Sequence, residues 1–85
     1  MEIEKKLKDV RMQAGLTQEQ VAEKIMVSRQ TVSNWENGKS LPDIVSIMSL
    51  SDLYQISIDE LLKGDEHMIQ HLEDSTNTVK SNRKI

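Results

Sequence analysis

The chain has 85 residues, no cysteine, no phenylalanine and a formal net charge of −3 at pH 7. This length allows one small domain, and the lack of cysteine excludes disulfides, thiolate metal sites and cysteine nucleophiles. The first segment, MEIEKKLKDV, is charged where a secretory signal would be apolar, and no stretch approaches the roughly 18 apolar residues of a membrane span. We therefore expect a small cytoplasmic domain with an aliphatic core and no membrane contact.

The negative charge is unevenly distributed along the chain. Residues 1–39 hold seven Lys or Arg and six Asp or Glu, a net charge of +1, whereas residues 40–64 carry −3 and residues 65–85 carry −1. Nucleic acid prefers basic partners, so the total charge argues mildly against it. The first 39 residues nevertheless suit such a partner, with binding that depends less on salt than that of a strongly basic domain.

The first element is a helix over residues 3–14. Its inner face is predicted from the helical spacing of Leu7, Val10 and Ala14. Gly15 suits the left-handed conformation just after a helix end. The lysines of the opposite side are expected in solvent, with phosphate contact as the alternative: Lys5, Lys6 and Lys8.

Residues 17–39 read as two short helices joined by a tight turn. Thr17 and Gln20 have the spacing of a capping box at the start of the first helix. Ser28 is a suitable cap for the second helix, which ends before Gly38. Two short helices with such a turn between them form a helix-turn-helix.

The outward face of the second helix carries residues that can read base edges: Arg29, Gln30, Ser33 and Asn34. Arg can donate two hydrogen bonds to guanine, and Gln or Asn can pair with adenine. No Glu or Lys occurs in residues 28–35, although both are common on an ordinary exposed face, which is the alternative interpretation. Val32 and Trp35 share the other side, so we expect Trp35 to pack between helices rather than stack on a base.

Further residues extend this pattern over residues 3–64: Arg11, Gly15-Leu16-Thr17-Gln18, Ala22, Val27-Ser28-Arg29-Gln30-Thr31-Val32-Ser33, Trp35-Glu36-Asn37-Gly38, Pro42, Leu50 and Asp59-Glu60-Leu61-Leu62. Together they resemble the lambda-repressor/Cro-like (XRE-type) helix-turn-helix regulators. The resemblance implies an all-α, five-helix, lambda-repressor-like DNA-binding domain over residues 1–64. It also implies homodimers on palindromic operators in double-stranded DNA, with half-sites about 10 base pairs apart.

The resemblance also implies roles for individual side chains. The helix over residues 28–37 enters the major groove and contacts bases through Arg29, Gln30, Thr31 and Asn34. For Thr31 the contact is a thymine methyl group, with a phosphate as the alternative. Phosphates are contacted by a second set: Gln18, Ser28, Ser33, Asn37 and Lys39. A solvated side chain is the alternative for Gln18. Arg11 and Glu36 form a partly buried ion pair that ties the first helix to the end of the third.

Two positions depart from the family pattern. Met26 and Gln55 stand where the family often has glycine or another residue that tolerates positive φ. Met26 either takes the left-handed conformation, which costs about 1 kcal/mol, or lengthens the helix before it. Gln55 makes the end of the fourth helix less distinct.

After the helix-turn-helix we expect two more helices. Pro42 suits a first helical turn, with Ser40 or Asp43 as the cap, and that helix runs to about Tyr54. Ser57 has a Glu three residues on, which is capping-box spacing, and starts a short fifth helix.

Residues 65–85 lie outside the resemblance and are expected to form a separate C-terminal helix or tail, partly flexible. A helix from about residue 65 to 73 places Met68, Ile69 and Leu72 on one apolar stripe. This helix could pack within the same chain, or its stripe could dock a second subunit or continue into a longer protein. The polar stretch after it is expected to be loose.

No pattern indicates catalysis or a cofactor. His67 and His71 have the spacing of a shared metal on a helix, but no third ligand joins them, so we expect solvated histidines. No nucleophile-base-acid set or Gly-rich phosphate loop is present. We therefore predict a non-enzymatic, sequence-specific DNA-binding transcriptional regulator, with repression as the favoured sign. An antitoxin-like or other protein-interaction module with the same fold is the alternative.

Overall fold

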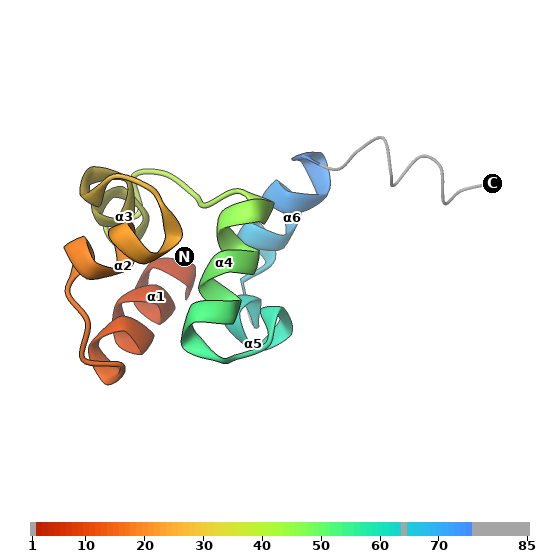
Figure 1. Ribbon diagram of the computed structural model, residues 1–85. Helices are drawn as coiled ribbons and strands as arrows, with labels where there is room; N and C mark the ends of the chain where they lie inside the picture. Colours follow the sequence, from red (N-terminus) through yellow and green to blue (C-terminus); the bar gives the residue numbers. More distant parts are fainter. Residues whose placement is uncertain (1, 64, 76–85) are drawn as a thin grey trace.

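The computed structural model describes residues 2–63 and 65–75, apart from the side chains of Glu2, His67, Asp74 and Ser75. The described residues form six helices and no strand, so the all-α prediction is confirmed (Figure 1). The helices follow in chain order: α1 (Glu2–Gln13), α2 (Gln18–Ile25), α3 (Arg29–Glu36), α4 (Ile44–Tyr54), α5 (Ile58–Leu62) and α6 (Glu66–Ser75).

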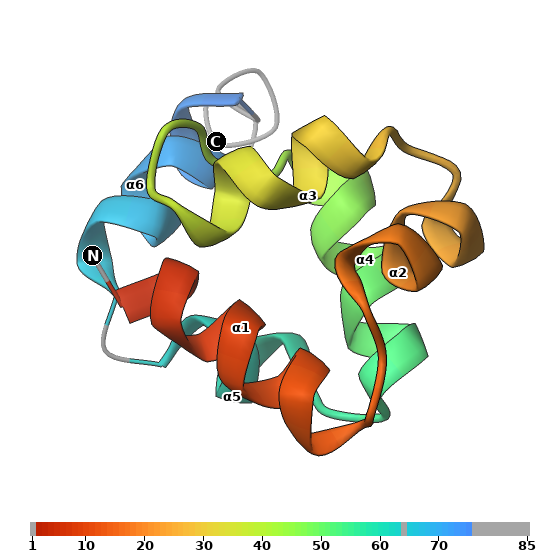
Figure 2. The ribbon, with the colours of Figure 1, turned by 90° about the vertical axis from the view of Figure 1, so that its left-hand side faces the viewer.

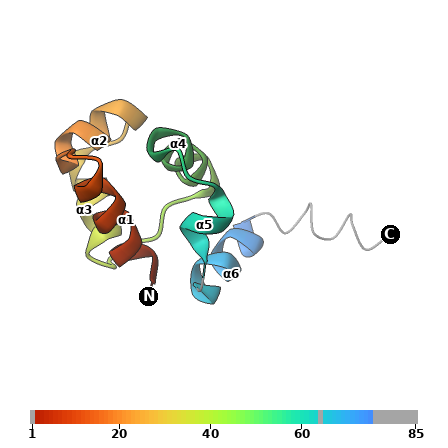
Figure 3. The same cartoon turned by 90° about the horizontal axis from the view of Figure 1, so that it is seen from below.

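The helices form two groups that face each other across one core. In Figure 3, α1, α2 and α3 lie on one side, and α4, α5 and α6 lie on the other. Buried side chains from all six helices meet in this core: Ile3, Leu7, Val21, Ala22, Val32, Trp35, Ile47, Leu50, Leu61, Leu62, Met68 and Leu72. Apart from Trp35, these side chains are aliphatic or methionine, as the composition requires.

Side-chain caps start five of the described helices: α2 to α5 and, through Asp65, α6. Thr17 Oγ1 accepts a hydrogen bond from the Gln20 N–H, and the Thr17 N–H donates to Gln20 Oε1, so the predicted capping box of α2 is complete. Ser28, Asp43 and Ser57 each accept from the N–H group three residues on, at α3, α4 and α5. These local bonds satisfy N–H groups that have no partner within the helix.

Two details of α4 and α5 differ from the sequence-based expectation. The Asp43 carboxylate accepts from the Ser46 N–H, so Asp43 is the cap and Pro42 lies before the first turn of α4. Pro42 is buried. At α5, the Glu60 carboxylate accepts from Lys6 Nζ at 3.2 Å, where a capping box would direct it to the Ser57 N–H. This ion pair ties α5 to α1.

Positive φ angles occur at four helix ends. Gly15 follows α1 with φ of 72°, and Gly38 follows α3 with φ of 75°. Met26 ends α2 with φ of 62°, and Gln55 ends α4 with φ of 58°. Met26 therefore adopts the left-handed conformation, α2 is not lengthened, and the end of α4 is well defined.

The inner face of α1 is shorter than the spacing predicted. Ile3 and Leu7 are buried, and Val10 is partly buried. Ala14 is exposed, because α1 ends at Gln13 and helical spacing no longer applies beyond that point.

Helix α6 packs on the same core as the first five helices. Met68 and Leu72 are buried there, whereas Ile69 keeps 39% of its surface exposed. Our expectation that the whole stripe could dock a second subunit is therefore wrong for Met68 and Leu72. The loose tail predicted after this helix falls mainly in residues 76–85, which are outside the described residues. None of the helices in the described ranges is long and apolar enough to cross a membrane.

Candidate nucleic-acid interface

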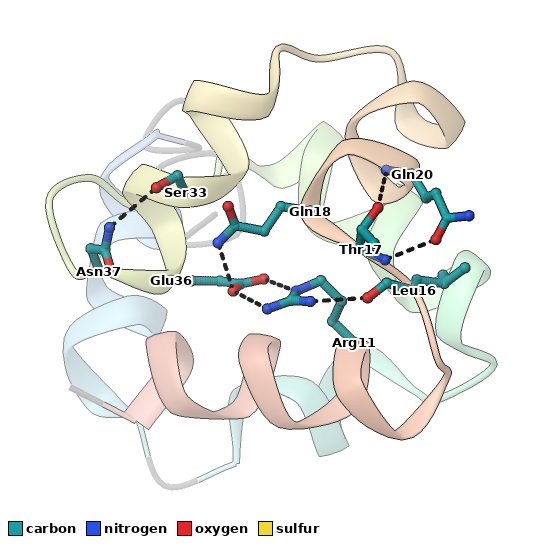
Figure 4. A network of polar contacts seen from close by, with 8 residues as sticks. All are labelled: Arg11, Leu16, Thr17, Gln18, Gln20, Ser33, Glu36 and Asn37. Atoms are coloured by element: carbon teal, nitrogen blue, oxygen red, sulfur yellow. Dashed lines mark hydrogen bonds and ion pairs between the residues drawn. The ribbon is translucent and has the colours of Figure 1, made fainter.

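A buried polar network joins the helix-turn-helix to α1 (Figure 4). Arg11 on α1 donates from Nε to Glu36 Oε2 at 2.8 Å and from Nη2 to Glu36 Oε1 at 3.0 Å. Its Nη1 donates to the carbonyl of Leu16 at 2.9 Å. Gln18, at the start of α2, donates from Nε2 to Glu36 Oε1 at 3.1 Å. One carboxylate thus holds α1, the start of α2 and the end of α3 together.

The ion pair in this network is largely shielded from water. The exposed fraction of the side chain is 13% for Arg11 and 3% for Glu36. Hydrogen bonding to the Glu36 carboxylate, in which Arg11 donates, raises the pKa of Arg11 above its ordinary value, and burial acts in the opposite direction. The structure therefore contains the ion pair predicted between these residues, in the bidentate geometry that suits a guanidinium and a carboxylate.

Helix α3 presents its polar side to solvent and its apolar side to the core. In Figure 2 it runs along the top edge of the molecule, with α1 and α5 below it. Val32 and Trp35 are buried, so Trp35 packs between helices as expected. Arg29 and Gln30 are exposed in the first turn, and Asn34 is partly buried.

Hydrogen bonds organise the side chains on this outward side. Gln30 Nε2 donates to Asn34 Oδ1 at 3.0 Å, one turn along the helix. Ser28 Oγ accepts from the Thr31 N–H at 3.0 Å and lies 2.8 Å from Thr31 Oγ1, with which it shares a hydrogen bond. Of the side chains predicted to contact bases, Gln30 and Asn34 therefore lie together on one side of α3.

Several residues predicted to contact phosphates lie near the end of α3. Asn37 Nδ2 donates to Ser33 Oγ at 3.2 Å near the end of α3, and Lys39 is exposed just beyond it. Gln18, at the start of α2, lies near the same end of α3, and it donates one N–H of its amide to Glu36. A glutamine amide has two such N–H groups, so the second remains for a phosphate, and the contact from Gln18 stays a prediction.

Asp65 is a structural residue that the sequence analysis missed. It is buried, and its carboxylate accepts from the Ile3 N–H at 2.7 Å and from the Met68 N–H at 2.9 Å. Asp directly before a helix is a known cap pattern, which could have indicated the bond to Met68. The bond to Ile3 crosses 62 positions of the chain and has no local signal.

No metal site is found among the described residues, which include no group of three or more His, Cys, Asp or Glu able to hold an ion. The structure does not describe how the side chains of His67 and His71 lie relative to each other, because the side chain of His67 is outside the described residues.

Comparison with known proteins identifies the family. The helix-turn-helix family matches residues 7–61, from α1 to α5. The chain belongs to the helix-turn-helix family. The solved structure of the P22 c2 repressor in complex with synthetic operator 9T in the presence of Tl⁺ superposes with a TM-score of 0.69 and 28% identity, over 74% of this chain and 96% of that one.

Curated relatives of this helix-turn-helix chain are named as transcriptional regulators. The HTH-type transcriptional activator BcrR of Enterococcus faecalis is 46% identical over 66 residues, which cover 78% of this chain and 32% of BcrR. The HTH-type transcriptional regulator ImmR of Bacillus subtilis is 41% identical over 66 residues, covering 78% of this chain and 52% of ImmR. The chain thus spans a third to a half of these relatives.

Proposed function

We propose that this chain binds specific sequences of double-stranded DNA and acts as a transcriptional regulator. The observation that carries the proposal is the polar outward side of α3, held rigidly on α1 by the network around Glu36. A helix placed in this way can insert its first turn into the major groove. The P22 c2 repressor, a structural neighbour, was solved in complex with synthetic operator 9T.

Base recognition is assigned to four side chains of α3. Arg29 is exposed, carries no Asp or Glu neighbour on α3, and can donate two hydrogen bonds to guanine. Gln30 and Asn34 offer amide groups to base edges, and the Thr31 methyl group can contact thymine. These contacts would supply the sequence preference.

Phosphate contacts are assigned to the groups around α3: Gln18, Ser28, Ser33, Asn37 and Lys39. The free N–H groups at the start of α2 and α3 add the positive end of each helix dipole. Such contacts fix the position of the domain on the duplex without reading the sequence.

We further propose that two chains bind one palindromic operator, with half-sites about 10 base pairs apart, and that binding represses transcription in the cytoplasm. The structural likeness to a protein named a repressor, P22 c2, favours repression, whereas BcrR is named an activator. A reporter with the operator placed across its promoter would test the sign: expression that rises when the chain is supplied would contradict repression.

Selection from randomised duplexes tests the function directly. Wild-type protein should enrich a palindrome, bind it with two chains per duplex in an anisotropy titration, and prefer it over random DNA. Arg29→Ala should lose about 1–3 kcal/mol of this preference at one base pair. Lys8→Ala, which also removes one exposed positive charge, is the matched control and should keep the preference. A wild-type protein that enriches no sequence at low salt would contradict the proposal.

The alternative is an antitoxin-like or other protein-interaction module. One observation favours it: Val45 and Met48 on α4 are 66% and 56% exposed and line a shallow depression together with Ile56 and Ile58. Exposed apolar surface of this kind can mark a protein contact. A defined partner whose binding survives Arg29→Ala but not Met48→Glu, together with no enriched DNA sequence, would support this alternative.

A further inference from the structure

We propose that Asn34 is a positioning residue for Gln30, and that Gln30 held in this way reads one adenine–thymine base pair. The inference rests on the proposed function and narrows it. It replaces the base contact proposed above for Asn34, which then acts through Gln30 rather than reading a base pair of its own.

The geometry of α3 distinguishes the two amides. Gln30 is exposed, whereas Asn34 is partly buried one helical turn further on. The backbone carbonyl of Asn34 accepts from the N–H of Lys39 at 2.9 Å and from the N–H of Ser40 at 3.4 Å, so this residue is anchored to the loop after α3. The backbone of Asn34 is therefore anchored at a partly buried position, and Gln30 is the exposed member of the pair.

The hydrogen bond between them determines what Gln30 can offer to DNA. A glutamine amide carries one oxygen and two N–H groups. One N–H of Gln30 is donated to Asn34 Oδ1 at 3.0 Å, which leaves the second N–H and Oε1. This donor and acceptor match the N7 acceptor and the N6 donor of adenine.

While Asn34 presents its Oδ1, the same bond disfavours turning over the Gln30 amide on its own. Rotating the Gln30 amide by half a turn would place its oxygen against Asn34 Oδ1, so that two acceptors would face each other. The orientation favours adenine over guanine, because guanine presents two acceptors, N7 and O6, to the major groove. A side chain oriented in advance also loses less rotamer freedom when it binds.

The inference predicts a shared effect of the two residues on one base pair. Wild type, Gln30→Ala, Asn34→Leu and the double variant are titrated by anisotropy against the selected duplex and its single-base-pair variants. We expect Gln30→Ala and Asn34→Leu to lose the preference, on the order of tenfold or more, at the same adenine–thymine pair. The double variant should then be no worse than Gln30→Ala alone. Circular dichroism and thermal melting check that each variant is folded.

Asn34→Asp tests the direction of the hydrogen bond. Aspartate has almost the shape of asparagine and keeps the acceptor for Gln30, but it carries no N–H. This variant should keep the wild-type base preference, while its negative charge weakens binding to every duplex alike. Asn34→Ser, whose hydroxyl is too short to reach Gln30, replaces Asn34→Leu if leucine disturbs α3.

Three results would overturn the inference. Asn34→Leu could change the preference at a different base pair from Gln30→Ala, with losses that add. Gln30→Ala could leave every base preference unchanged. Both results leave the proposed function intact if Arg29→Ala still loses the preference at a different base pair. If wild-type protein enriches no sequence at all, the inference fails together with the proposed function.

Discussion

At the scale of single residues, the carboxylate of Glu36 accepts three hydrogen bonds, two from Arg11 and one from Gln18. We predict that Glu36→Leu lowers the free energy of unfolding by about 3–5 kcal/mol, because it leaves the guanidinium buried without a counter-charge. The double variant Arg11→Met/Glu36→Leu should recover most of this loss. Urea titration followed by circular dichroism measures both, and a double variant as unstable as Glu36→Leu would refute the explanation.

Met26 offers a stabilising substitution. It adopts φ of 62° with 90% of its surface exposed, so a glycine would relieve backbone strain without removing packing. We expect Met26→Gly to raise the free energy of unfolding by up to about 1 kcal/mol. Gln55→Gly is the matched control with φ of 58°, and it should gain less because Gln55 Nε2 donates to the Asp52 carbonyl at 2.9 Å. Equal changes in urea midpoint would contradict this reasoning.

Tyr54 predicts a pH dependence. Burial raises its pKa to about 12, the Glu36 carboxylate adds to this, and Arg11 opposes it. In the unfolded chain the phenol titrates near 10, so the unfolded state releases its proton first as the pH rises. The stabilising contribution is therefore complete below about pH 10 and is lost as the pH rises toward 12. Urea titrations across this pH range should show a smaller decline in the free energy of unfolding for Tyr54→Phe than for wild type. Equal declines in the two proteins would contradict the prediction.

At the scale of elements, the starts of the helices follow from the sequence because a cap acts within three residues. The capping box of α2 and the caps of α3 and α5 were predicted from Thr17, Ser28 and Ser57. At α4, Asp43 was one of two candidate caps, and the structure selects it. The partner of the Glu60 carboxylate was not predicted, because Lys6 lies 54 positions away. Local chemistry is visible in a sequence, and contacts between elements are not.

Asp65 allows a test of how α6 is attached. Its carboxylate accepts from N–H groups at the start of both α1 and α6, where the positive ends of two helix dipoles favour it. Asp65→Ala should lower the free energy of unfolding by about 3 kcal/mol, because it leaves two N–H groups without their charged acceptor. Ser57→Ala removes an exposed cap and should lose only about 1 kcal/mol. Similar losses for both variants in urea titration would show that the bond to Ile3 contributes little.

At the scale of the whole molecule, the net charge of −3 limits the electrostatic contribution to DNA binding. We predict that Lys39→Ala weakens binding equally for the selected and random duplexes, and that it lowers the slope of log affinity against log salt by about 0.9. Anisotropy titrations at several salt concentrations measure this slope, with Lys8→Ala as the control that leaves it unchanged. A change of base preference in Lys39→Ala would show that this side chain reads sequence.

The sequence by itself determined the class of fold, the helix-turn-helix and the residue types on α3, because helical spacing, caps and side-chain chemistry are local properties. It also indicated the pair Arg11–Glu36, through the resemblance to a family. Only the tertiary structure decided that α6 completes the core, that Asp65 joins α1 to α6, and that Asn34 holds Gln30. The first depends on packing between helices, and the second joins residues that are 62 positions apart. The third depends on side-chain rotamers, which packing and hydrogen bonds select after the chain has folded.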